Sequence, residues 1–192
     1  MLTYLQGTTI PDISMATHQV ARFSIDPKLS YERAIHRIGH YLRGINNKGF
    51  IFRSKKIKDL ECYVDSNFAG EWDKDDASNP EAVMSRTGYV IKYANWPVLW
   101  CSKVQSEIDL STTETDYIAL RQSMREVIPF MNLLQEVNKI FNLNLLDEPK
   151  FHCKVFKNNN SCIVIATSNR FSPRTKHIAI KYQHFQYYVK KH

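Results

Sequence analysis

Two acidic side chains and a run of amides stand where this sequence could form a site for divalent cations. Asp65 follows an alternating apolar segment that predicts a β-strand, and Asp116 lies just after the segment STTE (111–114), a typical helix start. Carboxylates from separate elements are the ligands that Mg²⁺ prefers, and two such ions can promote hydrolysis of a phosphodiester. At the third place, after the apolar segment 151–156, the sequence has Lys157 followed by three asparagines. Two acids and an amide make a weaker cation site than three acids, because an amide carries no charge.

A sheet and a long helix are the elements that must position these residues. The strand that ends at Asp65 and the alternating segments 86–93 and 97–104 predict a three-stranded antiparallel meander. Helical periodicity covers 111–128, and Pro129 is expected to end or kink this helix before a second one over 130–141. A fourth strand over 151–156 and a helix over 161–167 follow. The last amphipathic segment covers 178–189.

The first 45 residues have a helical pattern, with amphipathic helices expected over 16–23 and 30–42. A short strand over 50–52 and a basic link containing Lys55, Lys56 and Lys58 follow, and this link predicts a domain boundary. The polar, acidic segment 70–85 is interpreted as a solvated loop, since nothing rigid holds its acids together.

The composition is that of a soluble globular chain with a basic surface. The 192 residues carry a net charge of +7 and a pI near 9.2, which favour a polyanion such as nucleic acid as partner, although a basic protein can also simply be soluble. The four cysteines are widely spaced and predict free thiols in a reducing compartment. Neither a secretory signal nor an apolar segment of the ~20 residues that span a bilayer is evident. We therefore expect a cytoplasmic or nuclear location and no membrane partner.

Several motifs in order resemble the ribonuclease H domain of copia-type LTR-retrotransposon Pol polyproteins. They are YVDSNFAG (63–70), SRTGY (85–89), STTETDYIAL (111–120), NNNS (158–161) and RTKHI (174–178). The motifs YLQGTTIPDI (4–13) and HYLRG (40–44) are similar to the end of the reverse transcriptase region that precedes that domain. The resemblance thus covers nearly the whole chain. It divides the chain into a reverse transcriptase remnant over 1–55 and a ribonuclease H-like domain over 56–192.

The resemblance implies an α/β fold, a ribonuclease H-like mixed sheet flanked by helices, and Mg²⁺-dependent cleavage of RNA in RNA–DNA hybrids. The first catalytic Asp of the family falls on Asp65, its catalytic Glu on Asp116 and its third catalytic acid on Asn158. The family also has an acidic residue at the position of Glu114. Glu114 lies two residues before Asp116, so on a helix it points to a different face. The fourth acid lies beyond the family's last strand, in a segment that this sequence ends before reaching, so the C-terminal strand is expected to be missing.

These departures predict an impaired nuclease. Asp116 keeps the charge but is one methylene shorter than Glu, a shift of roughly 1.5 Å in a site that tolerates about 0.5 Å. Asn158 cannot neutralise cations, so Mg²⁺ binding at Asp65 and Asp116 is in question. A hybrid is held mainly through phosphates and sugars, for which Arg174, Lys176 and His177 are the candidate contacts.

Three functional hypotheses remain open at this point. The chain is a catalytically impaired ribonuclease H-like fragment, a non-catalytic nucleic-acid-binding or interaction protein with the same fold, or a still active nuclease. Lys190 and Lys191 are further candidate phosphate contacts, whereas Trp96 and Trp100 are interpreted as packing residues rather than stacking platforms.

Overall fold

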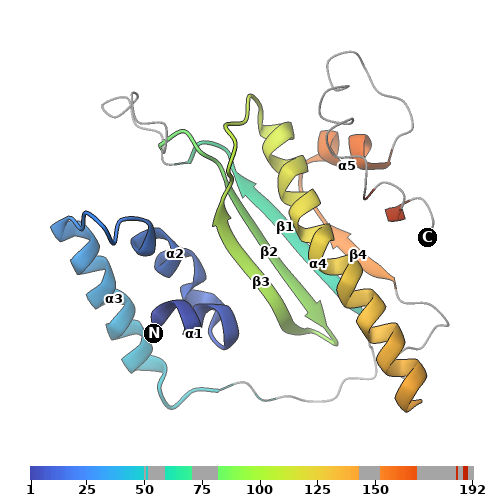
Figure 1. Ribbon diagram of the computed structural model, residues 1–192, viewed down its shortest axis with the longest axis horizontal. Coiled ribbons are helices and arrows are strands. Elements are labelled where there is room, and N and C mark those ends of the chain that lie inside the picture. The colour runs from blue at the N-terminus through green and yellow to red at the C-terminus, as the bar shows by residue number, and fades with distance from the viewer. Residues whose placement is uncertain are drawn as a thin grey trace.

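The computed structural model describes residues 1–49, 51, 59–70, 82–142, 152–167, 185 and 188–189. Helices α1 (Leu2–Thr8), α2 (Ser14–Arg22) and α3 (Leu29–Ile45) come first, with a short 3-10 helix, η1 (Pro11–Ile13), between α1 and α2. Strands β1 (Leu60–Asn67), β2 (Arg86–Tyr93) and β3 (Trp96–Val104) follow. The long helix α4 (Thr112–Phe141), strand β4 (Cys153–Phe156) and helix α5 (Asn160–Thr167) complete the described elements (Figure 1).

The sheet is mixed, with the order β3-β2-β1-β4. The pairs β1–β2 and β2–β3 are antiparallel, which confirms the predicted meander, and β4 is parallel to β1 with Tyr63 opposite Phe156. Since β1 and β4 run in the same direction, the residues that follow them meet at the same end of the sheet. The segment after β4 is therefore placed beside Asp65.

The core lies between one face of the sheet and α4, which runs along the strands on that face (Figure 1). Leu60, Cys62 and Val64 alternate along β1 and point into this core, whereas Tyr63 and Asp65 are exposed on the other face. Tyr117 and Val127 of α4 are fully buried against the sheet. This packing fixes the first turn of α4, and with it Asp116, against the end of β1.

Helix α4 begins at the N-cap Ser111, as the sequence predicts. The Ser111 hydroxyl accepts a hydrogen bond from the Glu114 backbone N–H at 3.1 Å, and the Glu114 carboxylate accepts one from the Leu110 backbone N–H at 3.1 Å. The helix ends at Asn142, whose left-handed conformation is a common helix terminator.

Pro129 does not end this helix and no second helix follows it, so these parts of the prediction were wrong. A single helix continues through Pro129 to Phe141. Pro129 and Arg125, the residue four positions earlier, are both exposed, so water can solvate the Arg125 carbonyl that the missing N–H leaves free. Buried Val127 and partly buried Met131 pack against the core on the other side of the helix, and this burial holds the helix together.

A two-residue turn joins β2 and β3, because Tyr93 pairs with Trp96. Ala94 and Asn95 both have positive φ, at 50° and 71°, as type I′ turns require. Asn tolerates this conformation, whereas in Ala the Cβ atom clashes with the carbonyl oxygen at a cost of about 1 kcal/mol.

We therefore expect Ala94→Asn to raise the free energy of unfolding by about 1 kcal/mol, measured by urea denaturation. Ala94→Val is the matched control and should lower it, since a β-branched residue is the least tolerant of positive φ. Equal stabilities of the two variants would contradict the assigned turn.

The N-terminal helices pack on the β3 edge of the sheet (Figure 1). The Trp100 indole N–H donates to the Gln6 carbonyl, and the Arg86 guanidinium donates to the Gln19 side-chain carbonyl. Trp100 thus anchors α1 to β3, in agreement with its interpretation as a packing residue. The domain division at residues 55 and 56 stays a prediction, since 52–58 lie outside the described residues.

Helices expected over 16–23, 30–42 and 161–167 are present as α2, α3 and α5 with slightly different ends. Most of the strand predicted over 50–52, of the loop predicted over 70–85 and of the segment 178–189 lies outside the described residues. None of the helices in the described ranges is both long and apolar enough to cross a membrane.

Candidate functional site

Asp65 and Asp116 both lie within ion-pair distance of one lysine at the end of the sheet, and their catalytic roles stay a prediction. Asp65 lies near the end of β1, and Asp116 lies in the second turn of α4. The Asp65 side chain is 74% exposed, whereas that of Asp116 is 10% exposed. The fold therefore brings one open and one enclosed carboxylate, 51 positions apart in sequence, to the same lysine.

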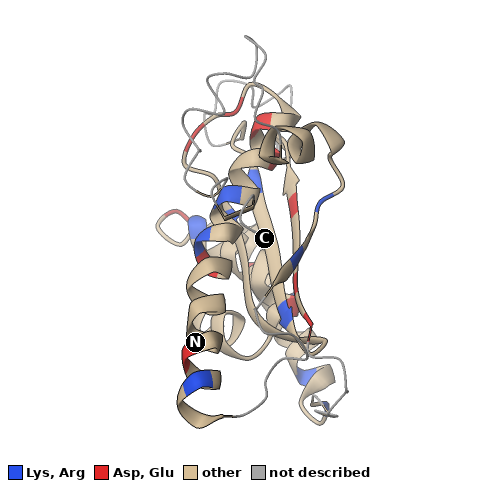
Figure 2. Cartoon of the chain, turned by 90° about the vertical axis from the view of Figure 1, so that its right-hand side faces the viewer, with Lys and Arg blue, Asp and Glu red and all other residues tan. Residues whose placement is uncertain are grey.

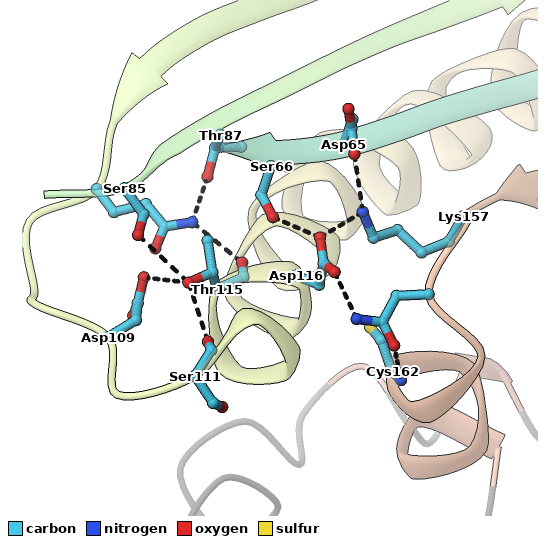
Figure 3. A network of polar contacts seen from close by, with 12 residues as sticks. Asp65, Ser66, Ser85, Thr87, Asp109, Ser111, Thr115, Asp116, Lys157 and Cys162 are labelled. Atoms are coloured by element: carbon cyan, nitrogen blue, oxygen red, sulfur yellow. Dashed lines mark hydrogen bonds and ion pairs between the residues drawn. The ribbon is translucent and has the colours of Figure 1, made fainter. Parts of the chain in front are cut away.

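A lysine ammonium lies between these carboxylates (Figure 3). Lys157 directly follows β4, and its side chain is only 2% exposed. Its Nζ atom is 2.5 Å from Asp116 Oδ1 and 3.3 Å from Asp65 Oδ1. The contact with Asp116 is a close ion pair in an enclosed place, and Nζ also donates a hydrogen bond to Asp65 Oδ1.

Two further donors bind the Asp116 carboxylate. The Ser66 hydroxyl donates to Oδ1, and the Asn159 amide nitrogen donates to Oδ2 at 2.7 Å (Figure 3). Asn159 is itself held in place, since its amide oxygen accepts the Cys162 backbone N–H at 3.1 Å at the start of α5. Both oxygens of Asp116 are therefore engaged, by a side chain of β1 and by two side chains of the segment between β4 and α5.

The residues of this site differ in part from those the sequence indicated. Asn158, the expected third position, is exposed, and of the neighbouring amides it is Asn159 that contacts Asp116. Sequence reasoning missed Lys157, Asn159 and Ser66. The parallel pairing of β4 with β1 carries the signal for them, because it places residues 157–159 beside Asp65, but the direction of β4 is not readable from a four-residue strand.

The donor set does not fit the Mg²⁺ that the resemblance implies. Mg²⁺ needs free carboxylate oxygens in octahedral geometry, but the oxygens of Asp116 already accept bonds from Lys157, Ser66 and Asn159. A cation placed there would also lie against the Lys157 ammonium and be repelled by it. Within the described ranges, no group of three or more His, Cys, Asp or Glu side chains is arranged to hold a metal.

A second polar cluster supports the first turn of α4 beside this site. The Thr115 hydroxyl donates to the Asp109 carboxylate at 2.8 Å, and the Gln105 amide bridges the Thr87 hydroxyl and the Thr115 carbonyl at 3.0 and 3.1 Å (Figure 3). Gln105 and Thr115 are almost fully buried. These bonds tie the residue before Asp116 to strand β2 and so fix the direction of the Asp116 side chain.

Burial raises the pKa of the Asp109 carboxyl, although hydrogen bonds from Thr115 and Ser85 offset part of the rise and the nearby acids Glu114 and Glu107 add to it. A raised folded-state pKa means that the protonated carboxyl is favoured by folding. Its contribution to stability is full below the unfolded value of 3.8 and is lost as the pH rises through the folded value.

Accordingly, Asp109→Asn should raise the thermal unfolding midpoint at neutral pH, because it removes a buried charge and keeps an oxygen for Thr115. The difference between native protein and variant should shrink as the pH falls towards 3.8. Thermal scans over this range measure it. A difference that grows on acidification would show that the Asp109 carboxylate is stabilised by the fold.

On the face of the sheet opposite α4, a groove of about 770 Å³ opens beside Asp65. Its floor includes Tyr63 and Phe156, which stack with ring centroids 4.7 Å apart, and its walls include Pro11 and Met15 from the N-terminal helices. The two aromatic side chains are partly exposed. The groove is thus mainly apolar, with Asp65 and Lys157 at one side.

The described residues account for only +2 of the net charge of +7. They contain 14 Lys and Arg against 12 Asp and Glu, and Figure 2 shows both signs interspersed over the helices and the sheet. Most of the excess lies in segments outside them. Arg174, Lys176 and His177 are among those residues, as are Lys55, Lys56, Lys58, Lys190 and Lys191, so their predicted roles stay predictions.

All four cysteines are free thiols, as predicted from their spacing. Burial raises the pKa of Cys62 to about 11 and that of Cys162 to about 12. Such thiols are protonated at neutral pH and react slowly. Cys62 and Cys162 are structural residues of the core.

The mixed sheet with a parallel fourth strand, covered by a long helix that carries an acid towards β1, defines a ribonuclease H-like fold. The chain is 32% identical over 184 residues to the retrovirus-related Pol polyprotein from transposon RE1 of Arabidopsis thaliana, a match that covers 96% of this chain and 11% of that protein. It is 30% identical over 181 residues to the retrovirus-related Pol polyprotein from transposon TNT 1-94 of Nicotiana tabacum, which covers 94% of this chain and 12% of that protein. The chain belongs to the Pol polyprotein family of copia-type transposons and corresponds to a fragment of it.

A shorter relative is the secreted RxLR effector protein 161 of Plasmopara viticola. It is 30% identical over 127 residues, covering 66% of this chain and 84% of that protein. No protein-family model matches the chain, and no solved structure matches it. The chain spans about a ninth of the length of the Pol polyproteins.

Proposed function

We propose that this chain is the ribonuclease H-type module of a copia-type Pol polyprotein and that it binds RNA–DNA hybrids without cleaving them. The observation that carries the loss of cleavage is the position of Lys157 between Asp65 and Asp116. Hydrolysis of a phosphodiester by two Mg²⁺ ions needs three or four free carboxylates, and this site offers two that are already bound to an ammonium.

Hybrid binding is proposed on different grounds. A hybrid is bound chiefly through phosphates and 2′-hydroxyls, which need cationic and polar donors rather than a metal. The net charge of +7 supplies such donors, and the motif RTKHI concentrates three of them in Arg174, Lys176 and His177.

The experiment measures binding and cleavage of a fluorescent RNA–DNA hybrid, once in EDTA and once in Mg²⁺. We expect the same affinity in both buffers, an intact RNA strand on denaturing gels, and an affinity that falls with salt. The double variant Arg174→Ala/Lys176→Ala should bind more weakly, whereas Lys154→Ala, which removes an exposed lysine paired with Asp59, is the matched control.

RNA cleavage in Mg²⁺ that is lost in Asp65→Ala would show that the chain is an active nuclease. A lack of hybrid binding in both buffers would instead favour an interaction protein that has kept only the fold. Either result contradicts the proposal, and the two are distinguishable on the same gel and binding curve.

A further inference from the structure

The enclosed ammonium of Lys157 is an unusual occupant for a place between two carboxylates. Lysine is seldom fully buried, and a buried ammonium is stable only when it is paired and hydrogen-bonded. Here the side chain is 2% exposed, and both acids lie within ion-pair distance of Nζ. Lys157 lies between strand β4 and helix α5, and these two elements fix the position of its backbone.

Lys154, on β4, forms an ion pair at the surface that can be compared with the enclosed ion pair of Lys157. Lys154 Nζ is 2.8 Å from Asp59 Oδ2, but the two side chains are 62% and 43% exposed. Such pairs contribute little, because water competes for both charges. Lys157 differs in being enclosed and in contacting two acids rather than one.

The other polar groups of the site form hydrogen bonds with Asp116 and occupy both of its carboxylate oxygens. Asp116 accepts from Ser66 and Asn159 as well as from Lys157, and Asn159 is fixed by the Cys162 N–H. Three polar groups, one from β1 and two from the segment between β4 and α5, converge on one carboxylate. A divalent ion could bind between the two carboxylates only if the Lys157 ammonium were removed from this place.

We propose that Lys157 is a built-in counter-ion, which occupies the place of a divalent cation between Asp65 and Asp116 and makes this site independent of metal. The inference rests on the proposed function, because it names the cause of the lost cleavage at the same site. It predicts that the native chain folds and binds its partner without divalent ions, and that removing the ammonium uncovers a latent cation site.

The test is Mn²⁺ binding followed by electron paramagnetic resonance, with no nucleic acid present. Native protein and the Lys154→Met control should show no Asp65-dependent binding at millimolar Mn²⁺. Lys157→Met should bind Mn²⁺ at least about tenfold more tightly than the native chain, because a nearby positive charge is replaced by an apolar group of similar length. Asp65→Asn added to Lys157→Met should abolish that binding.

Binding of Mn²⁺ by the native chain that Asp65→Asn removes would overturn the inference. So would a folded Lys157→Met variant that binds Mn²⁺ no better than the native chain does. If Lys157→Met does not fold, the Mn²⁺ titrations of the native chain and of its Asp65→Asn variant decide the question by themselves. Hybrid binding plays no part in these measurements, so failure of the proposed function is seen separately.

Discussion

Replacing Lys157 with methionine is expected to lower the free energy of unfolding by about 3 kcal/mol. The substitution leaves the Asp116 carboxylate enclosed, with its hydrogen bonds from Ser66 and Asn159 but without a neutralising charge. An enclosed charge that loses its partner is costly, and most of the loss comes from this uncompensated carboxylate. Urea denaturation of native protein and variant measures the difference.

Two controls separate the enclosed pair from lysine loss in general. Lys154→Met should change stability by less than about 1 kcal/mol, because its pair with Asp59 is exposed. Adding Asp116→Asn to Lys157→Met should restore much of the stability, since both charges are then gone. Equal effects of Lys154→Met and Lys157→Met would show that the ammonium is not enclosed.

Tyr117→Ala is the second large effect and tests the packing that positions Asp116. Tyr117 is fully buried between α4 and the sheet, with its ring 5.3 Å from that of Phe185. Truncation of a buried aromatic ring removes apolar burial and leaves a cavity, so we expect a loss of about 3–5 kcal/mol in urea denaturation.

The matched controls lie at the same position and on the same helix. Tyr117→Phe keeps the ring and should cost only on the order of 1 kcal/mol. Ile140→Ala, near the end of α4, removes a side chain that is 72% exposed and should change stability by no more than about 0.5 kcal/mol. A Tyr117→Ala loss as small as that of Ile140→Ala would mean that the start of α4 does not pack on the sheet as described.

The sequence predicted most elements because their signals are local. The N-cap Ser111 and the alternating residues of β1 each define an element without reference to the rest of the chain. The meander was also predictable, since strands joined by a two-residue turn can only be antiparallel. The predicted end of the helix at Pro129 was wrong because a proline on the exposed face of a helix can be tolerated. Which face is exposed is set by tertiary packing, which the local sequence does not show.

The sequence indicated the two carboxylates of the candidate site, Asp65 and Asp116, but not the lysine that pairs with them. Asp65 and Asp116 were found from motif and spacing, and the structure brings both to the same lysine. Lys157 follows an apolar strand, where a lysine ordinarily extends into solvent. Its inward direction follows from the pairing of β4 with β1 and from the enclosed Asp116, both of which are long-range features.

The most direct test of the lysine-for-metal account is a crystal structure of the native chain soaked in Mn²⁺, with anomalous diffraction to locate the metal. The account predicts Lys157 Nζ within ion-pair distance of Asp65 and Asp116 and no anomalous peak between these carboxylates. An Mn²⁺ peak bound by both acids, with the Lys157 side chain turned away, would contradict it.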